Sequence, residues 1–315
     1  MKTLTKTIGI AALAAMTALP SFAQKDEGPG QGQVLVTVLP KKGTATLPAL
    51  SPDLIKLKVN NKDTSVTNVT APRETGPIEL VVLFDSSLRT SMGTQLQEIE
   101  KFIHGLPPNV KLAIAYMQYG NANFATPFTT DRDVSTKALH LPSGLPGTSG
   151  SPYFCISDIA KRWPQGNGPA RRELLMITDG VDTYNPRYDP EDPYVQRAIS
   201  DSVRAGIVIY SLYWRDQGRF GRSGYANYAG QNLLVQVAET TGGVNFWNGF
   251  TNPVSFEPYL EELVQRMENQ YQVSFAAPLN GKPQVETLKL KVSMPGANIS
   301  APQQVYVTQP GIAQN

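Results

Sequence analysis

Two continuous apolar runs in the chain each end in an aspartate. IELVVLF, residues 78–84, runs into Asp85-Ser86-Ser87, and LLMIT, residues 174–178, runs into Asp179-Gly180. A run that is apolar at consecutive positions is typical of a strand buried on both faces, as in a parallel sheet. Ligands of open α/β sheets bind just beyond the carboxyl ends of the strands. The pattern therefore predicts a parallel sheet with two carboxylates at its binding edge.

Apolar runs alternate with amphipathic segments through the middle of the chain. Further strands are predicted at 110–117, 124–128, 207–213 and 244–247. Helices are predicted at 131–139, 154–163, 194–205, 232–240 and 258–269, and after Thr90 or Ser91 as N-cap. This order indicates a doubly wound, mostly parallel sheet with helices on both faces.

The segments on either side of this unit have a β pattern. LIKLKV at 54–59 and TLKLKV at 287–292 alternate apolar and charged residues, as strands with one solvated face do. Other strands are predicted at 34–39, 64–70, 271–275 and 305–308, and the glycine-rich stretch 25–33 is predicted to be flexible. Because the ends of an inserted domain usually lie close together, we expect these strands to form one small β-sandwich or to add to each other's edges.

The predicted division of the chain has four parts. Residues 1–23 read as a secretory signal peptide, with a basic start, an apolar stretch and the small-x-small site Ser21-Phe22-Ala23. A β segment with its linker (24–76), the α/β unit (77–270) and a second β segment (271–315) follow. No later apolar run is long enough to span a bilayer. We therefore expect an exported protein, periplasmic or secreted, from a bacterium.

Composition and the absence of known motifs exclude several classes of function. The net charge of +2 gives no reason to expect nucleic acid as a partner. The single cysteine, Cys155, excludes an intrachain disulfide and is predicted to be a small buried residue. The sequence has no G-x-S-x-G, H-E-x-x-H or phosphate-binding glycine loop, and His104 and His140 are predicted to be ordinary residues of helix surfaces. These features favour a non-enzymatic protein.

The motifs Asp85-Ser86-Ser87 and Ile177-Thr178-Asp179-Gly180, in this order of elements, resemble those of a von Willebrand factor A domain over residues 77–270. With its signal peptide and flanking β segments, the chain is similar to the secreted A-domain-related proteins found in Acidobacteria. The resemblance implies a metal-ion-dependent adhesion site. In that site a D-x-S-x-S motif, a threonine and an aspartate bind a divalent cation, usually Mg²⁺, which an acidic residue of a partner protein completes.

Carried over to this chain, the resemblance gives an incomplete ligand set. Asp85 and Ser87 match the first and third motif positions, and Asp179 matches the aspartate after the middle strand. The fifth position is Arg89. If the loop instead carries a two-residue insertion, Ser91 of Ser91-Met92-Gly93 supplies the second hydroxyl.

The loop that should supply a threonine is also altered. Aligning Gly150-Ser151 with the family's Gly-Thr makes Ser151 the ligand, and Thr148 is the alternative. Asp85, Ser87, Ser151 and Asp179 with waters meet the need of Mg²⁺ for about six oxygens. Mn²⁺ and Ca²⁺ are alternative cations, and a site with no metal is the third possibility.

Arg89 decides between these possibilities. A guanidinium fixed near the cation would cost about 4 kcal/mol in repulsion at intermediate dielectric. It could instead pair with Asp85 and Asp179 in place of the metal, or point into solvent. Without a metal, Asp85 reads as a helix N-cap and Asp179-Gly180 as a plain turn.

Two long segments follow the same strand ends. Residues 181–193 are acidic, and residues 214–230 mix arginine with Tyr, Gly, Ser and Asn, which is a recognition-loop composition. The alternative is a solvated linker. We predict that Arg89, Arg219, Arg222 and Tyr225 bind a protein partner of unknown identity at this edge. The alternative function is a scaffold protein that has lost its metal, and a metal-dependent hydrolase is a third class.

Overall fold

The computed structural model describes residues 28–44, 46–88, 92–142, 150–164, 170–215, 223–279 and 281–310. The predicted signal peptide lies outside them. Among the described helices, none combines the length and the apolar character needed to cross a membrane.

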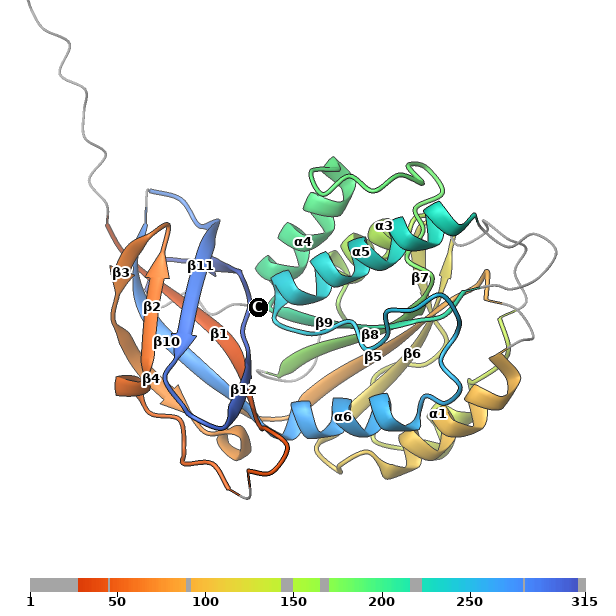
Figure 1. Cartoon of the computed structure of the whole chain (residues 1–315), viewed down its shortest axis with the longest axis horizontal. Helices are drawn as coiled ribbons and strands as arrows, with labels where there is room; N and C mark the ends of the chain where they lie inside the picture. Colours follow the sequence, from red (N-terminus) through yellow and green to blue (C-terminus); the bar gives the residue numbers. More distant parts are fainter. Residues whose placement is uncertain are drawn as a thin grey trace, which may run out of the picture.

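A five-stranded sheet forms the centre of the α/β unit (Figure 1). Its order is β7-β6-β5-β8-β9, and only the edge strand β7 is antiparallel to its neighbour. The strands are β5 (Ile78–Asp85), β6 (Val110–Gln118), β7 (Asn121–Phe124), β8 (Arg171–Thr178) and β9 (Ile207–Tyr213). Every residue of β5 and β9 is buried, which confirms the reading of continuous apolar runs as strands covered on both faces.

Helices cover both faces of this sheet, as predicted (Figure 1). One face carries α1 (Gly93–Gly105), α2 (Arg132–Lys137) and α6 (Glu257–Glu268). The other carries α3 (Pro152–Lys161), α4 (Pro193–Ala205) and α5 (Gly224–Thr241). The single cysteine, Cys155 of α3, is fully buried in the second core, so the prediction of a small buried residue is confirmed.

Three elements differ from the sequence prediction. The edge strand β7 begins at Asn121, because Tyr119 and Gly120 take positive φ angles of 51° and 75° and make a tight turn directly after β6. The predicted strand 244–247 is only one bridge, between Ser211 and Asn245. Helix α5 begins eight residues before the predicted position 232, because Ser223 caps it by accepting a hydrogen bond from the Ala226 amide.

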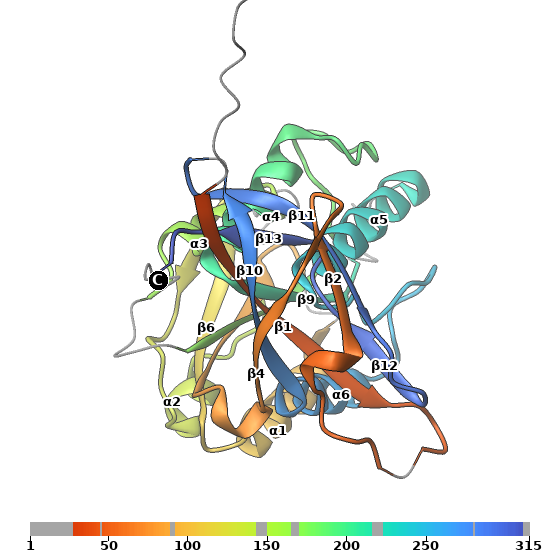
Figure 2. The ribbon, with the colours of Figure 1, turned by 90° about the vertical axis from the view of Figure 1, so that its left-hand side faces the viewer.

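The N- and C-terminal segments form one β-sandwich, as predicted, which lies beside the α/β unit in Figure 1 and faces the viewer in Figure 2. Its two four-stranded sheets have the orders β12-β1-β10-β4 and β13-β11-β2-β3. The elements are β1 (Gly28–Pro40), η1 (Pro52–Leu54), β2 (Ile55–Val59), β3 (Lys62–Thr64), β4 (Val66–Thr70), η2 (Pro72–Glu74), β10 (Gln270–Leu279), β11 (Gln284–Val292), β12 (Ala297–Ser300) and β13 (Gln304–Val307). Strands β1 and β10, which flank the α/β unit in the chain, are direct antiparallel neighbours.

The prediction that residues 25–33 are flexible is wrong from Gly28 onward, where β1 begins. Glycine suits this strand because a Cβ on Gly32 would lie 2.5 Å from the Phe275 ring, and one on Gly30 would lie 2.8 Å from the Ala277 carbonyl oxygen. The missing side chains therefore make room for β10 and its core phenylalanine. Strand β12, which the pattern did not predict, extends the same sheet beyond β1.

A buried polar cluster joins the sheet to the sandwich. Arg171, at the start of β8, donates from Nη1 to the Met267 carbonyl (2.7 Å) and to Oε1 of Gln270 (2.8 Å), the first residue of β10. Gln270 in turn donates to the Tyr210 hydroxyl (3.0 Å). Glu173 lies fully buried beside Arg171, and burial raises its pKa to about 7 although Arg171 acts in the opposite direction.

The raised pKa of Glu173 makes the free energy of unfolding depend on pH, and its direction follows from the direction of the shift. Between the ordinary value of 4.5 and about 7, the folded state keeps a proton on Glu173 that the unfolded state has lost. Stability therefore falls as pH rises through this window, by at most about 1.4 kcal/mol per pH unit. Urea unfolding of wild type and Glu173→Gln at several pH values measures this. We expect the variant to lose the slope and exposed Glu268→Gln to keep it; equal slopes in all three proteins contradict the prediction.

Candidate functional site

A hydrogen-bond network closes the carboxyl edge of the sheet between β5 and β8. Asp85, the last residue of β5, accepts on Oδ1 from the Ser87 amide (2.8 Å) and the Ser87 hydroxyl (2.6 Å). Its Oδ2 accepts from the hydroxyl of Thr178, the last residue of β8 (2.7 Å). All three side chains are nearly inaccessible to solvent. The parallel register that pairs Phe84 with Ile177 brings them together.

Asp179 follows directly in the chain and is 3% exposed. Its Oδ1 accepts from the Val181 amide (2.9 Å), so the carboxylate also shapes its own turn. Gly180 takes a φ of 69° there, and a Cβ on it would lie 2.6 Å from the carbonyl oxygen of Gly230 in α5. The turn after β8 is therefore held between its own hydrogen bond and the α5 backbone.

Ser151 lies at the start of α3, fully buried, but its hydroxyl does not cap the helix. It donates to Oδ2 of Asp182 (3.0 Å). Two more bonds tie the same segments together, from Thr183 Oγ1 to the Gly150 carbonyl (3.1 Å) and from the Tyr153 hydroxyl to the Gly180 carbonyl (2.8 Å). Ser151 thus lies at the carboxyl edge of the sheet, where it contacts the segment after β8 by its hydrogen bond to Asp182.

The acidic segment 181–193 is ordered by its own aspartates. Asp182 is 2% exposed and accepts from the Tyr184 amide (2.8 Å), and burial raises its pKa. Asp192 caps α4 by accepting from the Tyr194 and Val195 amides. Asp189 and Glu191 are exposed. The two buried aspartates therefore stabilise the loop, which is not a featureless linker.

Exposed large apolar side chains gather around this edge. The described part of the chain has nine, and among these Val134 alone belongs to a distant helix, α2. The other eight follow the carboxyl ends of the strands or precede α6: Tyr119, Tyr184, Tyr188, Tyr194, Tyr225, Tyr228, Phe250 and Val254. We call these eight residues the aromatic rim. Phe154 links part of it, with ring centroids 5.2 Å from Tyr184 and 4.8 Å from Tyr194.

Five of the predicted site residues lie in the described part of the chain, and the others lie outside it. Asp85, Ser87, Ser151 and Asp179 all lie at the carboxyl edge. Arg89, Ser91, Thr148, Arg219 and Arg222 lie outside the described residues. Tyr225 was predicted in a loop; it lies in the first turn of α5, 61% exposed.

Sequence reasoning missed two residues of this edge. Thr178 ends an apolar run and stands in the Ile177-Thr178-Asp179-Gly180 motif but is not among the predicted ligands, although a threonine at the last position of a buried strand is a signal for a hydroxyl at the sheet edge. Asp182 was counted only as loop charge. The available signal was its position three residues after Asp179, in the Asp-Gly-Val-Asp sequence.

The donor chemistry of the edge fits a hard divalent cation. Asp85 and Asp179 contribute carboxylates from neighbouring strands, and Ser87 and Thr178 contribute hydroxyls. Mg²⁺ takes such oxygens and usually keeps several waters. No three His, Cys, Asp or Glu residues in the described part are grouped to hold a metal, so hydroxyls and water would have to complete the shell. Asp85, Ser87 and Asp179 also make contacts beyond those named above.

Comparison with known proteins gives distant structural similarity. No protein-family model and no curated protein matches the sequence. Among solved structures, BatB from Bacteroides thetaiotaomicron is 14% identical, with a TM-score of 0.43 over 60% of this chain and 97% of that one. A von Willebrand factor type A protein from Catenulispora acidiphila is 11% identical, with a TM-score of 0.42 over 91% of this chain and 75% of that one. The manganese-loaded TRAP protein of Plasmodium vivax is 10% identical, with a TM-score of 0.40 over 76% of this chain and 97% of that one.

Proposed function

We propose that this protein is an exported, non-enzymatic binding protein that recognises a protein partner at the carboxyl edge of its central sheet. The observation that carries the proposal is the aromatic rim around the buried network of Asp85, Ser87 and Thr178. Membership of the secreted A-domain-related proteins of Acidobacteria belongs to the same proposal.

The rim has the chemistry of a protein interface. Six of its eight members are tyrosines, whose rings bury apolar area while the hydroxyl keeps a hydrogen-bond partner. Tyrosine is enriched in interface centres and among the residues that contribute most to binding. On a monomer, single exposed apolar residues need no explanation, but a cluster around one edge does. The rim therefore supports recognition there.

A divalent cation is the second part of the proposal. Asp85 and Asp179 would hold it with the hydroxyls of Ser87 and Thr178, and Ser151 would adjoin through Asp182. When bound, the cation would supply a positive centre for an acidic group of the partner. The residues themselves orient the oxygens and exclude water from the base of the site.

Cation binding is tested on the mature protein by isothermal titration with Mg²⁺, Mn²⁺ and Ca²⁺ and by melting with and without EDTA. We expect one site and a higher melting temperature with Mg²⁺ or Mn²⁺, because a ligand of the folded state stabilises it by about 2.7 kcal/mol at a hundredfold excess over Kd. Asp179→Asn keeps the acceptor for the Val181 amide and removes the charge, so it should abolish the effect. Asp53→Asn, exposed in the sandwich, is the control. If titration releases no heat and the melting temperature does not change, the proposal that the protein binds a cation is wrong.

Partner recognition is tested by capture from envelope extract with and without EDTA. Tyr184→Ser and Tyr225→Ser remove exposed rings from the rim, so each should weaken capture of a specific protein. Val134→Ser, which removes an exposed apolar side chain away from the edge, should not. Capture that is indifferent to both tyrosines would contradict recognition at this edge.

A scaffold protein without metal is the second candidate. The observation that favours it is internal satisfaction of the site oxygens: Ser87 donates to Asp85 and Ser151 donates to Asp182. A scaffold should keep all partner binding in the Asp179→Asn variant and in EDTA. A binding protein that uses a cation should lose partner binding both in the Asp179→Asn variant and in EDTA.

A further inference from the structure

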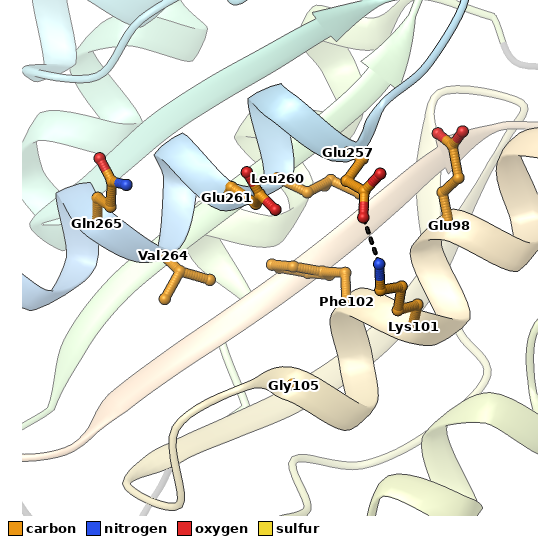
Figure 3. Close-up of a pocket in the computed structure, with 9 residues that line it drawn as sticks. All are labelled: Glu98, Lys101, Phe102, Gly105, Glu257, Leu260, Glu261, Val264 and Gln265. Carbon is orange, nitrogen blue, oxygen red and sulfur yellow. Dashed lines mark hydrogen bonds and ion pairs between the residues drawn. The ribbon is translucent and has the colours of Figure 1, made fainter.

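A groove lies between α1 and α6 (Figure 3), on the face of the sheet opposite α3, α4 and α5 (Figure 1). Its volume is about 360 Å³, enough for one or two side chains of a partner. The base is apolar and made by Phe102 of α1 with Leu260 and Val264 of α6. Gly105 opens one end, since a Cβ there would meet nothing within 4 Å.

The rim of this groove is acidic. Glu98, Glu257 and Glu261 line it together with one cation, Lys101, which leaves two negative charges. Lys101 forms an ion pair with Glu257 across the mouth (Figure 3). That pair, with smaller contributions from Glu261 and Glu98, raises the pKa of Lys101, so all three carboxylates act on the same small volume.

The three carboxylates differ in how they are held. Glu98 accepts a hydrogen bond from the Phe256 amide and so fixes the start of α6. Glu257 has Lys101 as its partner. Glu261 is exposed and has no hydrogen-bond or ion-pair partner among the described residues. Glu261 is therefore the carboxylate most available to a ligand.

We propose that this groove docks a basic amphipathic helical segment of a partner protein, with an apolar side chain against Phe102, Leu260 and Val264 and an arginine or lysine beside Glu261 and Glu257. Charge complementarity argues for this occupant, because an acidic rim attracts a cation and repels an acidic or phosphorylated segment. A groove between two helices with an apolar base suits an amphipathic helix.

The global charge of the protein makes this local preference meaningful. The full chain carries a net charge of +2, and the chain without its predicted signal peptide, whose charged residues are Lys2 and Lys6, carries none, so a basic segment is not attracted to the molecule as a whole. Binding of a basic peptide must therefore come from a local acidic surface. The residues that line the groove include none of the proposed cation ligands, so its occupation does not depend on the proposed cation.

The test uses the mature protein and a fluorescent helical peptide with two leucines and two arginines on one face. A second peptide replaces arginine with citrulline, which keeps the shape and removes the charge. We expect the arginine peptide to bind roughly tenfold more tightly, because its guanidinium can make charge-assisted hydrogen bonds to Glu261 and Glu257 that neutral citrulline cannot. EDTA should change neither affinity.

Three variants locate the binding. Glu261→Gln should weaken the arginine peptide several-fold, and Glu268→Gln, an exposed glutamate at the end of α6 outside the groove, should not. Gly105→Leu fills the open end without removing a charge, and should weaken both peptides while leaving melting temperature unchanged or higher.

Several results would overturn the proposal. They are equal affinity for the arginine and citrulline peptides, an unchanged Kd in both Glu261→Gln and Gly105→Leu, and equal losses in Glu261→Gln and Glu268→Gln. Failure of cation binding at the carboxyl edge leaves these outcomes unaffected, so the two proposals fail separately.

Discussion

Replacing Gly230 with alanine should destabilise the protein by about 3 kcal/mol or more and disturb the carboxyl edge. A Cβ at this position of α5 would lie 2.3 Å from the Asp179 carbonyl oxygen, 2.9 Å from the carbonyl carbon of Gly180 and 3.0 Å from the Val181 amide nitrogen. All three atoms belong to the backbone, so no side-chain rotation relieves the overlap. Either α5 or the turn after β8 must move.

The same helix provides the control. Gly224 lies in the first turn of α5, and a Cβ on it would meet nothing within 4 Å. Gly224→Ala should therefore be neutral or stabilise by up to about 1 kcal/mol through helix propensity. Chemical denaturation of both variants measures the difference. Equal stability of the two proteins would show that α5 and the turn do not approach each other this closely.

Replacing Asp85 with alanine should cost about 2–4 kcal/mol, the second large effect. The carboxylate accepts from the Ser87 amide, the Ser87 hydroxyl and the Thr178 hydroxyl, and all of these are buried. Alanine removes every one of these acceptors at once. The Ser87 amide cannot turn to another partner as a hydroxyl can, so its desolvation is left uncompensated.

Asp189→Ala is the matched control for this loss. Asp189 lies in the loop that follows β8, is exposed, and among the described residues its carboxylate accepts only from the Glu191 amide (3.0 Å). Its replacement should cost less than about 1 kcal/mol. Denaturation of the two variants in EDTA keeps any cation contribution out of the comparison. If Asp85→Ala is no less stable than Asp189→Ala, the network does not hold the edge together.

The pattern of apolar residues was sufficient to predict the central strands of the α/β sheet, because a strand that is buried on both faces is apolar at consecutive positions. The runs 78–84 and 174–178 are apolar at nearly every position because these stretches of β5 and β8 are buried on both faces. The alternating pattern of residues 55–59 likewise follows from one buried and one exposed face, seen directly in β2.

Periodicity failed where packing or a turn outweighed it. Residues 28–33 lack the side chains of a strand, yet they form one because their backbone must approach Phe275. The start of α5 contains Gly224 and Gly230, which are poor helix formers, yet the Ser223 cap and the contact with the Asp179 turn favour the helix. Such long-range reasons are invisible to a local pattern.

The sequence by itself determined the two buried strands, the aspartates that end them and the sandwich character of the flanking segments. These depend on the alternation or continuity of apolar residues, which a chain carries locally. Only the tertiary structure decided that Ser151 donates to Asp182, that Thr178 donates to Asp85, and that tyrosines from several loops and from the first turns of α4 and α5 share one edge. Hydrogen bonds and surface clusters join residues far apart in the chain, so their partners are set by register and packing.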